Sequence, residues 1–187
     1  DCLTPGINPP GCDNDSPPRR AANIWVGAAY VFVRSGTTWT EQAFIKANNP
    51  RPYNSFGVRL ALSGDGNTLA VTAYLEDNAA QGVRAPEPQP FLVVDHLDPW
   101  REQRNQAEES GAVYFYTRSG TTWTQRAYVK GSNTEAGDEF GSAVALSTDG
   151  RVMAVGAHNE DGSSRGINGD QADNSADDSG AVYVFSY

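Results

Sequence analysis

One stretch of this chain is repeated at a constant distance. Residues 34–77 align with residues 118–161 without a gap, at an offset of 84, and 22 of the 44 aligned positions are identical. The seven letters at 34–40 recur unchanged at 118–124. A fixed-offset repeat of this size indicates one supersecondary unit used at least twice, so we expect the chain to fold as an array. Arrays present surfaces for binding or assembly more often than they build catalytic sites.

Each copy of the repeat contains four strand-like runs. They lie at 29–33, 39–46, 56–63 and 68–74 in the first copy, and at 111–117, 123–130, 140–147 and 152–157 in the second. Aromatic and β-branched residues alternate in these runs, as suits a pleated surface. Asp65-Gly66 and Asp149-Gly150 are hairpin signals. We therefore predict an all-β fold of four-stranded antiparallel meanders, the unit of a propeller blade, with about two blades and incomplete ends.

The repeat divides the chain into segments. The first repeat occupies 27–77, the second 111–161, and an acidic loop follows at 162–179. Residues 1–26 are interpreted as a degenerate copy of that loop, because Gly6-Ile7-Asn8 echoes Gly166-Ile167-Asn168. Residues 180–187 repeat the opening strand, and we expect this terminal strand to be unpartnered.

Residues 78–110 form an insertion that is longer than the corresponding loop of the second repeat. Asp98 is typical of a helix N-cap and Pro99 of a first helical position, so the pattern predicts a short helix over 100–109. His96 lies in the same insertion between two aspartates, where a solvated or structural role is favoured over a functional one.

Charge and cysteine content narrow the class of protein. The net charge of −9 disfavours a nucleic-acid partner, because an acidic surface repels phosphate backbones. No apolar run approaches the roughly 20 residues that span a bilayer. Cys2 and Cys12 lie close together, and a disulfide between them would fit an exported protein, with two unpaired thiols as the alternative. The start at Asp1 rather than Met is typical of a processed N-terminus.

The letters resemble the FG-GAP repeats of integrin alpha-like β-propellers, in the form common in bacterial secreted and surface proteins. The residues that carry the resemblance are Phe56-Gly57, Phe140-Gly141, Val155-Gly156-Ala157 and the run 180–185. In the phase of that family, 56–130 is one complete blade. The strands at the C-terminal end then supply three-quarters of another blade, and residues 39–46 are a candidate for its outer strand. The resemblance implies a secreted or cell-surface location.

Members of that family often carry a calcium loop where this chain has residues 63–67 and 147–151. These segments hold one carboxylate each, Asp65 and Asp149, whereas calcium takes about six to eight oxygen ligands. We do not expect a metal there. The acidic loop is a better candidate for Ca²⁺, because hard oxygen ligands lie on a glycine-rich backbone; a solvated turn capped by its own Asp and Asn side chains is the alternative. The candidate ligands are Asp161, Asn168, Asp170, Asp173, Asn174, Asp177 and Asp178.

Two further groups are candidates for contact with other molecules. Trp39 and Trp123 occupy equivalent repeat positions and are either sugar-stacking platforms or blade packing. The terminal strand is a candidate assembly strand, through Ala181, Val182, Tyr183, Val184, Phe185 and Tyr187. Catalysis finds little support, since the sequence has no nucleophile elbow, phosphate loop or histidine cluster.

Three functional classes follow. The leading hypothesis is a non-enzymatic extracellular structural protein whose incomplete blades are completed by neighbouring copies of itself, in a ring or a fibre. The alternative is a calcium-dependent adhesin or lectin-like module cut from a longer propeller, with surface glycans or proteins as partners. An enzyme is the least favoured class.

Overall fold

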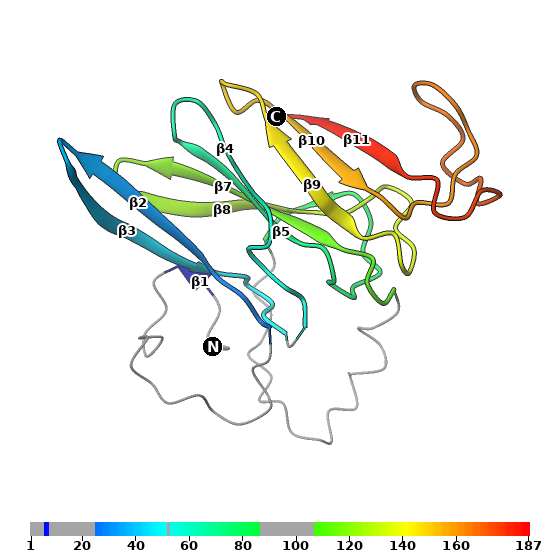
Figure 1. Cartoon of the computed structure of the whole chain (residues 1–187), viewed down its shortest axis with the longest axis horizontal. Helices are drawn as coiled ribbons and strands as arrows, with labels where there is room; N and C mark the ends of the chain where they lie inside the picture. Colours follow the sequence, from blue (N-terminus) through cyan, green and yellow to red (C-terminus); the bar gives the residue numbers. More distant parts are fainter. Residues whose placement is uncertain (1–5, 8–24, 52, 87–106) are drawn as a thin grey trace, which may run out of the picture.

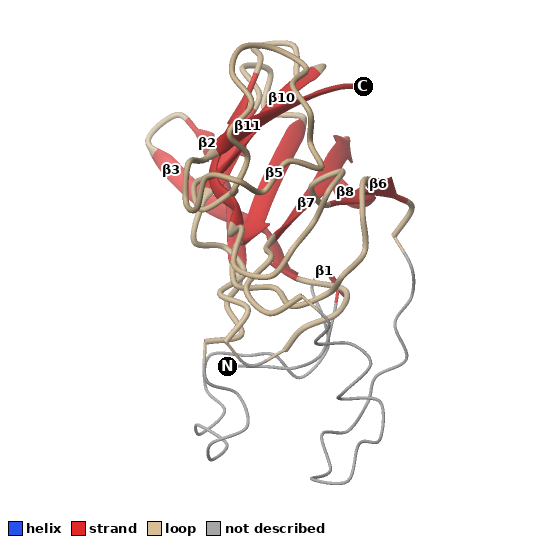
Figure 2. Cartoon of the chain, turned by 90° about the vertical axis from the view of Figure 1, so that its right-hand side faces the viewer, coloured by secondary structure: helices blue, strands red, loops and turns tan. Residues whose placement is uncertain are grey.

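The chain folds into three antiparallel sheets that lie next to one another (Figure 1), in a computed structural model that describes residues 6–7, 25–51, 53–86 and 107–187. Every regular element of these residues is a strand (Figure 2), so the all-β prediction is confirmed. Cys2 and Cys12, and most of the helix expected at 100–109, lie outside the described residues. The described end of that segment, 107–109, forms a bend and a turn. No helix in the described ranges has the length and apolar character needed to cross a bilayer.

The central sheet contains all four strands of a blade. Its strands are β4 (Leu60–Leu62), β5 (Thr68–Ala73), β7 (Ala112–Ser119) and β8 (Thr122–Val129), in that spatial order, with the short β6 (Val83–Arg84) on the outer edge of β8. This is the antiparallel meander expected for 56–130. The first strand is shorter than the predicted run 56–63. Ser55 and Gly57 have φ angles of 55° and 94°, which an extended strand does not adopt, and the strand starts at Leu60.

The second sheet carries the first three strands of a further blade. β9 (Phe140–Leu146), β10 (Val152–Ala157) and β11 (Ala181–Ser186) correspond to β4, β5 and β7 of the central sheet. β11 pairs with β10 along its whole length, from Ala157 opposite Ala181 to Val152 opposite Ser186. The expectation of an unpartnered terminal strand is therefore corrected on one side. Of the two edges of β11, one pairs with β10 and the outer one has no strand beside it in the described part of the chain.

The third sheet carries the last strands of a preceding blade. β2 (Ala29–Ser35) and β3 (Thr38–Lys46) form a hairpin that corresponds to β7 and β8, and the two-residue β1 (Gly6–Ile7) pairs with β3 as β6 pairs with β8. Within one copy, β3 does not form the outer strand of the β9–β11 sheet, because the central sheet lies between them (Figure 1).

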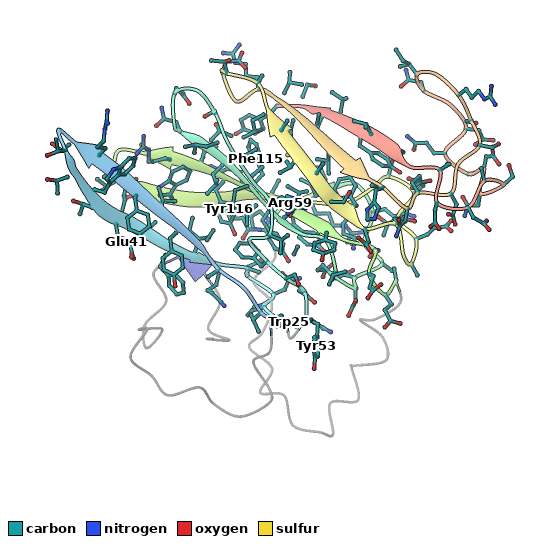
Figure 3. All side chains as sticks on the ribbon, in the orientation of Figure 1. Trp25, Glu41, Tyr53, Arg59, Phe115 and Tyr116 are labelled. Atoms are coloured by element: carbon teal, nitrogen blue, oxygen red, sulfur yellow. The ribbon has the colours of Figure 1, made fainter. Side chains whose placement is uncertain are left out.

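The core consists of two clusters on opposite faces of β7. Tyr114 and Tyr116 pack against the N-terminal hairpin, where Ala29 and Ile45 are buried. Phe115, which alternates with the two tyrosines, packs on the other side with residues of β9, β10 and β11. Figure 3 shows Phe115 and Tyr116 in the middle of the molecule. This period of two explains why β7 is apolar at consecutive positions, since a strand between two sheets is buried on both faces.

Close backbone approach between neighbouring sheets explains the Phe-Gly and Gly-Ala letters. Gly111, at the start of β7, has a φ of 80°, and a Cβ there would lie 2.1 Å from the carbonyl oxygen of Phe140 in the next sheet. Gly27 approaches Phe56 in the same way, at 1.9 Å. A side chain at either glycine would push the sheets apart, so these positions require glycine.

Candidate functional site

The hairpin turns at 63–67 and 147–151 are closed by their own side chains. Asp65 accepts hydrogen bonds from Ser63 Oγ at 2.6 Å and from the N–H of Asn67 at 3.0 Å. Asp149 accepts from Ser147 Oγ at 2.6 Å and from the N–H of Arg151 at 3.1 Å. The single carboxylate of each loop is therefore a turn-capping group. The hydrogen bonds from the serine lower the pKa of each aspartate.

The acidic loop uses several of its carboxylates in the same way. Asp173 accepts from Ser163 Oγ and from Ser175 Oγ, at 2.5 Å and 2.6 Å, and these hydrogen bonds lower its pKa. Asp161 accepts from the N–H of Asp178 at 2.8 Å, and Asp170 from the N–H of Ala172 at 3.0 Å.

The remaining candidate ligands of this loop, Asn168, Asn174 and Asp177, are exposed. Among the described residues, no group of three or more His, Cys, Asp or Glu side chains is placed to hold a metal ion. Ca²⁺ binding by this loop stays a prediction.

The two equivalent tryptophans have opposite environments. Trp123 is 4% exposed, donates its indole N–H to Gln42 Oε1 at 3.0 Å and lies under the guanidinium of Arg118, which is 5.6 Å from the ring centroid. Its ring is packed between two sheets rather than presented to a ligand. Trp39 is 64% exposed, because no sheet covers this face of β3 in the described residues.

Glu76 and Lys130 form a buried ion pair at one end of the central sheet. Glu76 follows β5 and Lys130 follows β8, and the Lys130 Nζ lies 3.0 Å from Glu76 Oε2 with side chains that are 0% and 2% exposed. The ammonium group also donates to Ser110 Oγ at 2.7 Å. Burial lowers the pKa of Lys130, and the charge of Glu76 opposes that shift. Both charges are satisfied, which a buried pair requires.

Further polar groups complete this buried pair on the glutamate side. The Tyr128 hydroxyl donates to Glu76 Oε2 at 2.7 Å, and Asn49 Nδ2 donates to Oε1 at 3.2 Å. Burial and the charge of Glu76 raise the pKa of Tyr128 well above its usual value, so the hydroxyl stays a donor. Asn49 comes from the segment after β3, so the pair also links the central sheet to the N-terminal hairpin.

Glu160 is the same repeat position as Glu76, but it has no lysine partner among the described residues. It accepts from Asn133 Nδ2 at 2.8 Å, the equivalent of Asn49, and from the Tyr183 hydroxyl at 2.8 Å. Glu160 is 5% exposed, and no lysine or arginine of the described residues lies within ion-pair distance of it. A buried carboxylate is thus held by neutral donors alone.

Lys46 occupies the same repeat position as Lys130 and is a buried lysine without a glutamate partner among the described residues. It is 1% exposed, and its Nζ donates to the carbonyl oxygen of Gly27. No carboxylate in the described ranges lies within ion-pair distance of it. Burial lowers the pKa of Lys46 to about 8. The chain therefore contains one complete glutamate–lysine pair, one glutamate half-site and one lysine half-site.

Sequence reasoning missed these charged residues, although the repeat contained the signal. Lys46 and Lys130 are identical in the alignment at an offset of 84, and so are Glu76 and Glu160. Each lies at the end of an apolar strand, where charged residues are seldom buried unless they are paired. The burial of these four residues was not predicted because strand ends are usually solvated.

Comparison with known proteins identifies the repeat. Residues 123–185, which run from β8 to β11, match the family model described as the FG-GAP repeat. This confirms the resemblance that the Phe-Gly and Gly-Ala letters indicate. FG-GAP repeats build β-propeller-like domains, which are often extracellular or adhesive and generally non-catalytic. A search of curated proteins finds no match to the chain.

Proposed function

We propose that this protein is a non-enzymatic extracellular structural subunit whose incomplete terminal blades are completed by neighbouring copies. The observation that carries the proposal is the burial of equivalent repeat positions. Val113 of β7 is fully buried, whereas its counterpart Val182 of β11 is 70% exposed. Trp123 and Trp39 differ in the same sense. Repeat positions that are buried in the central sheet are thus exposed in both terminal sheets.

The exposed side chains are those that pack blade against blade in the centre. At the N-terminal end these are Tyr30, Phe32 and Trp39, whose counterparts Tyr114, Tyr116 and Trp123 are buried in the core. Covering one large apolar side chain contributes roughly 1.5–3 kcal/mol. Several such side chains at each end favour association over a solvated monomer.

Open strand edges favour the same conclusion. β2 lies at the edge of its sheet, and β11 at the edge of the other terminal sheet. In the described part of the chain neither edge has a strand beside it, and an open strand edge is a template for another strand. The N-terminal sheet has strands of the β7–β8 type and the C-terminal sheet has strands of the β4–β5–β7 type, so each end contains what the other needs.

The two ends are different surfaces, and this determines the symmetry of assembly. An interface between two different patches is heterologous and generates a ring if the rotation closes, or a filament if it does not. A two-fold dimer would place like ends together, which completes neither blade. Head-to-tail assembly is therefore the proposed mode.

The test is the size of particles formed by the purified chain, measured by light scattering and negative-stain electron microscopy over a micromolar concentration series. We expect rings or fibres. A monodisperse monomer at every concentration would overturn the proposal and direct attention to a ligand-binding module.

Two substitutions make this test sharper. Val152→Asp places a charge on the exposed face of β10, and Phe32→Asp does the same on β2. Each variant alone should stay monomeric at concentrations where the parent assembles, and an equal mixture should stop at dimers, because one intact end of each type remains. Thr121→Asp, at the exposed tip of the β7–β8 hairpin of the central sheet, is the control and should assemble like the parent.

A further inference from the structure

β2 and β11 carry almost the same letters at the same place in a blade. Residues 27–32 read Gly-Ala-Ala-Tyr-Val-Phe, and residues 180–185 read Gly-Ala-Val-Tyr-Val-Phe. Both align with the start of β7 in the central sheet. β11 lies beside β10, whereas the equivalent edge of β2 has no strand beside it in the described part of the chain. The place beside β10 therefore suits either strand.

The backbone contact at the start of each strand is also shared. The N–H of Gly111 donates to the carbonyl of Glu76 at 2.9 Å, and the N–H of Gly180 donates to the carbonyl of Glu160 at 2.8 Å. Gly27 occupies the same repeat position as these two glycines. If β2 took the place of β11, Gly27 would meet the carbonyl of Glu160.

Such a placement also brings the two charged half-sites together. In the central sheet, Glu76 and Lys130 meet because β5, β7 and β8 are adjacent. The hairpin β2–β3 carries Lys46 where β7–β8 carries Lys130. Beside β10, it would put this buried ammonium group next to the buried carboxylate of Glu160.

We infer that the β2–β3 hairpin of one copy replaces β11 beside β10 of a second copy, and that Lys46 then pairs with Glu160 of that second copy. This exchange rests on the proposed head-to-tail assembly and specifies the strands that perform it. Exchange of an equivalent element between copies is a low-cost route to association, because the incoming strand packs and pairs much as the displaced strand did. The new ion pair and the added outer strand β3 favour the exchanged arrangement over the monomer, in which β11 stays beside β10.

The exchange also accounts for the exposed faces of both terminal strands. Tyr30 and Phe32 would take the places of Tyr183 and Phe185, which pack against the central sheet of the second copy. The opposite face of β2 holds Ala29 and Val31, which are already packed on the central sheet of their own copy. The composite blade would therefore be covered on both faces, whereas β11 leaves Val182 and Val184 uncovered.

A disulfide that locks β11 in place tests the exchange. Ala154 and Val184 lie opposite each other in the β10–β11 pair. Opposite residues of antiparallel strands have Cα atoms about 4.5–5.5 Å apart, within the range of about 4.4–6.8 Å that a disulfide spans. In a Cys2→Ser/Cys12→Ser background, the oxidised Ala154→Cys/Val184→Cys variant should remain monomeric and should assemble after reduction.

Cross-linking between copies gives an independent measurement if the locked variant folds poorly. Val31 is the repeat equivalent of Val184, so the exchange would place it opposite Ala154 of another copy. Chains with Val31→Cys, mixed with chains with Ala154→Cys in the same background, should form a disulfide-linked heterodimer on oxidation. Thr37→Cys, at the exposed tip of the hairpin, replaces Val31→Cys as the control and should not cross-link.

The outcomes separate the inference from the function on which it rests. The exchange is supported if the parent assembles and the oxidised lock does not. It is also supported if the parent assembles and the Val31–Ala154 cross-link forms. The exchange is overturned if the parent assembles, the Val31–Ala154 cross-link does not form and the oxidised lock assembles as well as the parent. Head-to-tail assembly by stacked faces would then remain. A parent chain that stays monomeric overturns both.

Discussion

The central blade and the two terminal part-blades are built from the same repeat but differ in what surrounds it. Lys130 in the central sheet has Glu76 as its partner, whereas Lys46 in the N-terminal sheet has a backbone carbonyl. Val113 is covered by a neighbouring sheet and Val182 is not. The contrast shows that the repeat encodes an interaction between blades as well as a blade. Among the described residues, the central sheet alone has both the ion pair and the full apolar cover.

The largest expected effect concerns the two equivalent lysines. Lys130→Met leaves Glu76 buried without its cation and should lower the free energy of unfolding by about 3–5 kcal/mol. Lys46→Met removes a buried charge that has no carboxylate partner among the described residues of one copy, so the dilute monomer should be unchanged or more stable. Urea unfolding of the two variants measures the contrast. Equal losses would mean that Lys46 has an ionic partner within its own chain.

Two equivalent valines probe the apolar part of the same comparison. Val113→Ala removes two buried methylene equivalents and should cost about 1.5–2 kcal/mol. Val182→Ala, at an exposed position of β11, should stay within about 0.5 kcal/mol. Thermal or urea unfolding of the dilute chain gives both values. A large loss at Val182 would show that the outer face of β11 is covered even in a single copy.

The charge on Lys46 adds a pH dependence to the assembly. Its pKa is about 8 in one copy, and pairing with Glu160 would raise it. The contribution of a group whose pKa rises on assembly is fully present below its free pKa and is lost as the pH rises through the pKa of the paired form. Association should therefore weaken from about pH 8 upward, by at most about tenfold per pH unit.

Sedimentation between pH 7 and 9 measures this dependence, and the Lys46→Met variant should show a flat profile. Asp138 and Tyr183 also lie near Glu160. Burial raises the pKa of Asp138 to about 6 and that of Tyr183 above its usual range, so neither titrates strongly in this window. Weakening of the Lys46→Met assembly over the same pH range would assign the effect to another group.

The smallest expected effect concerns calcium at the acidic loop, which belongs to the C-terminal end alone. With a dissociation constant of about 10⁻⁴–10⁻³ M, typical of extracellular sites, 1 mM Ca²⁺ would stabilise the fold by about 0.4–1.4 kcal/mol. Hydrogen exchange should slow in residues 162–179 and not in residues 78–86, the start of the corresponding insertion. Equal exchange with Ca²⁺, with Mg²⁺ and without either ion would contradict calcium binding.

Strand positions were predictable because they depend on local pattern. The alternation of side chains along 111–117 and the Asp-Gly turns specify a strand and its end, and the structure has β7 and both hairpins where these signals lie. The Phe-Gly and Gly-Ala letters indicated the repeat family because close backbone approach requires glycine at those places. The shortened β4 was not predictable, since it follows from the backbone angles of Ser55 and Gly57 in their tertiary setting.

The kind of sheet, the strand order within a blade and the identity of the repeat all follow from the amino-acid sequence alone. Which copy of each repeated residue is buried, and which charge has a partner, depends on the packing of the sheets. A strand signal is read from adjacent residues, whereas burial depends on neighbours far along the chain. Glu76 and Lys130 are 54 residues apart in the sequence, and the pairing of strands in the central sheet brings them together. The same sheet lies between Lys46 and Glu160 and keeps them apart.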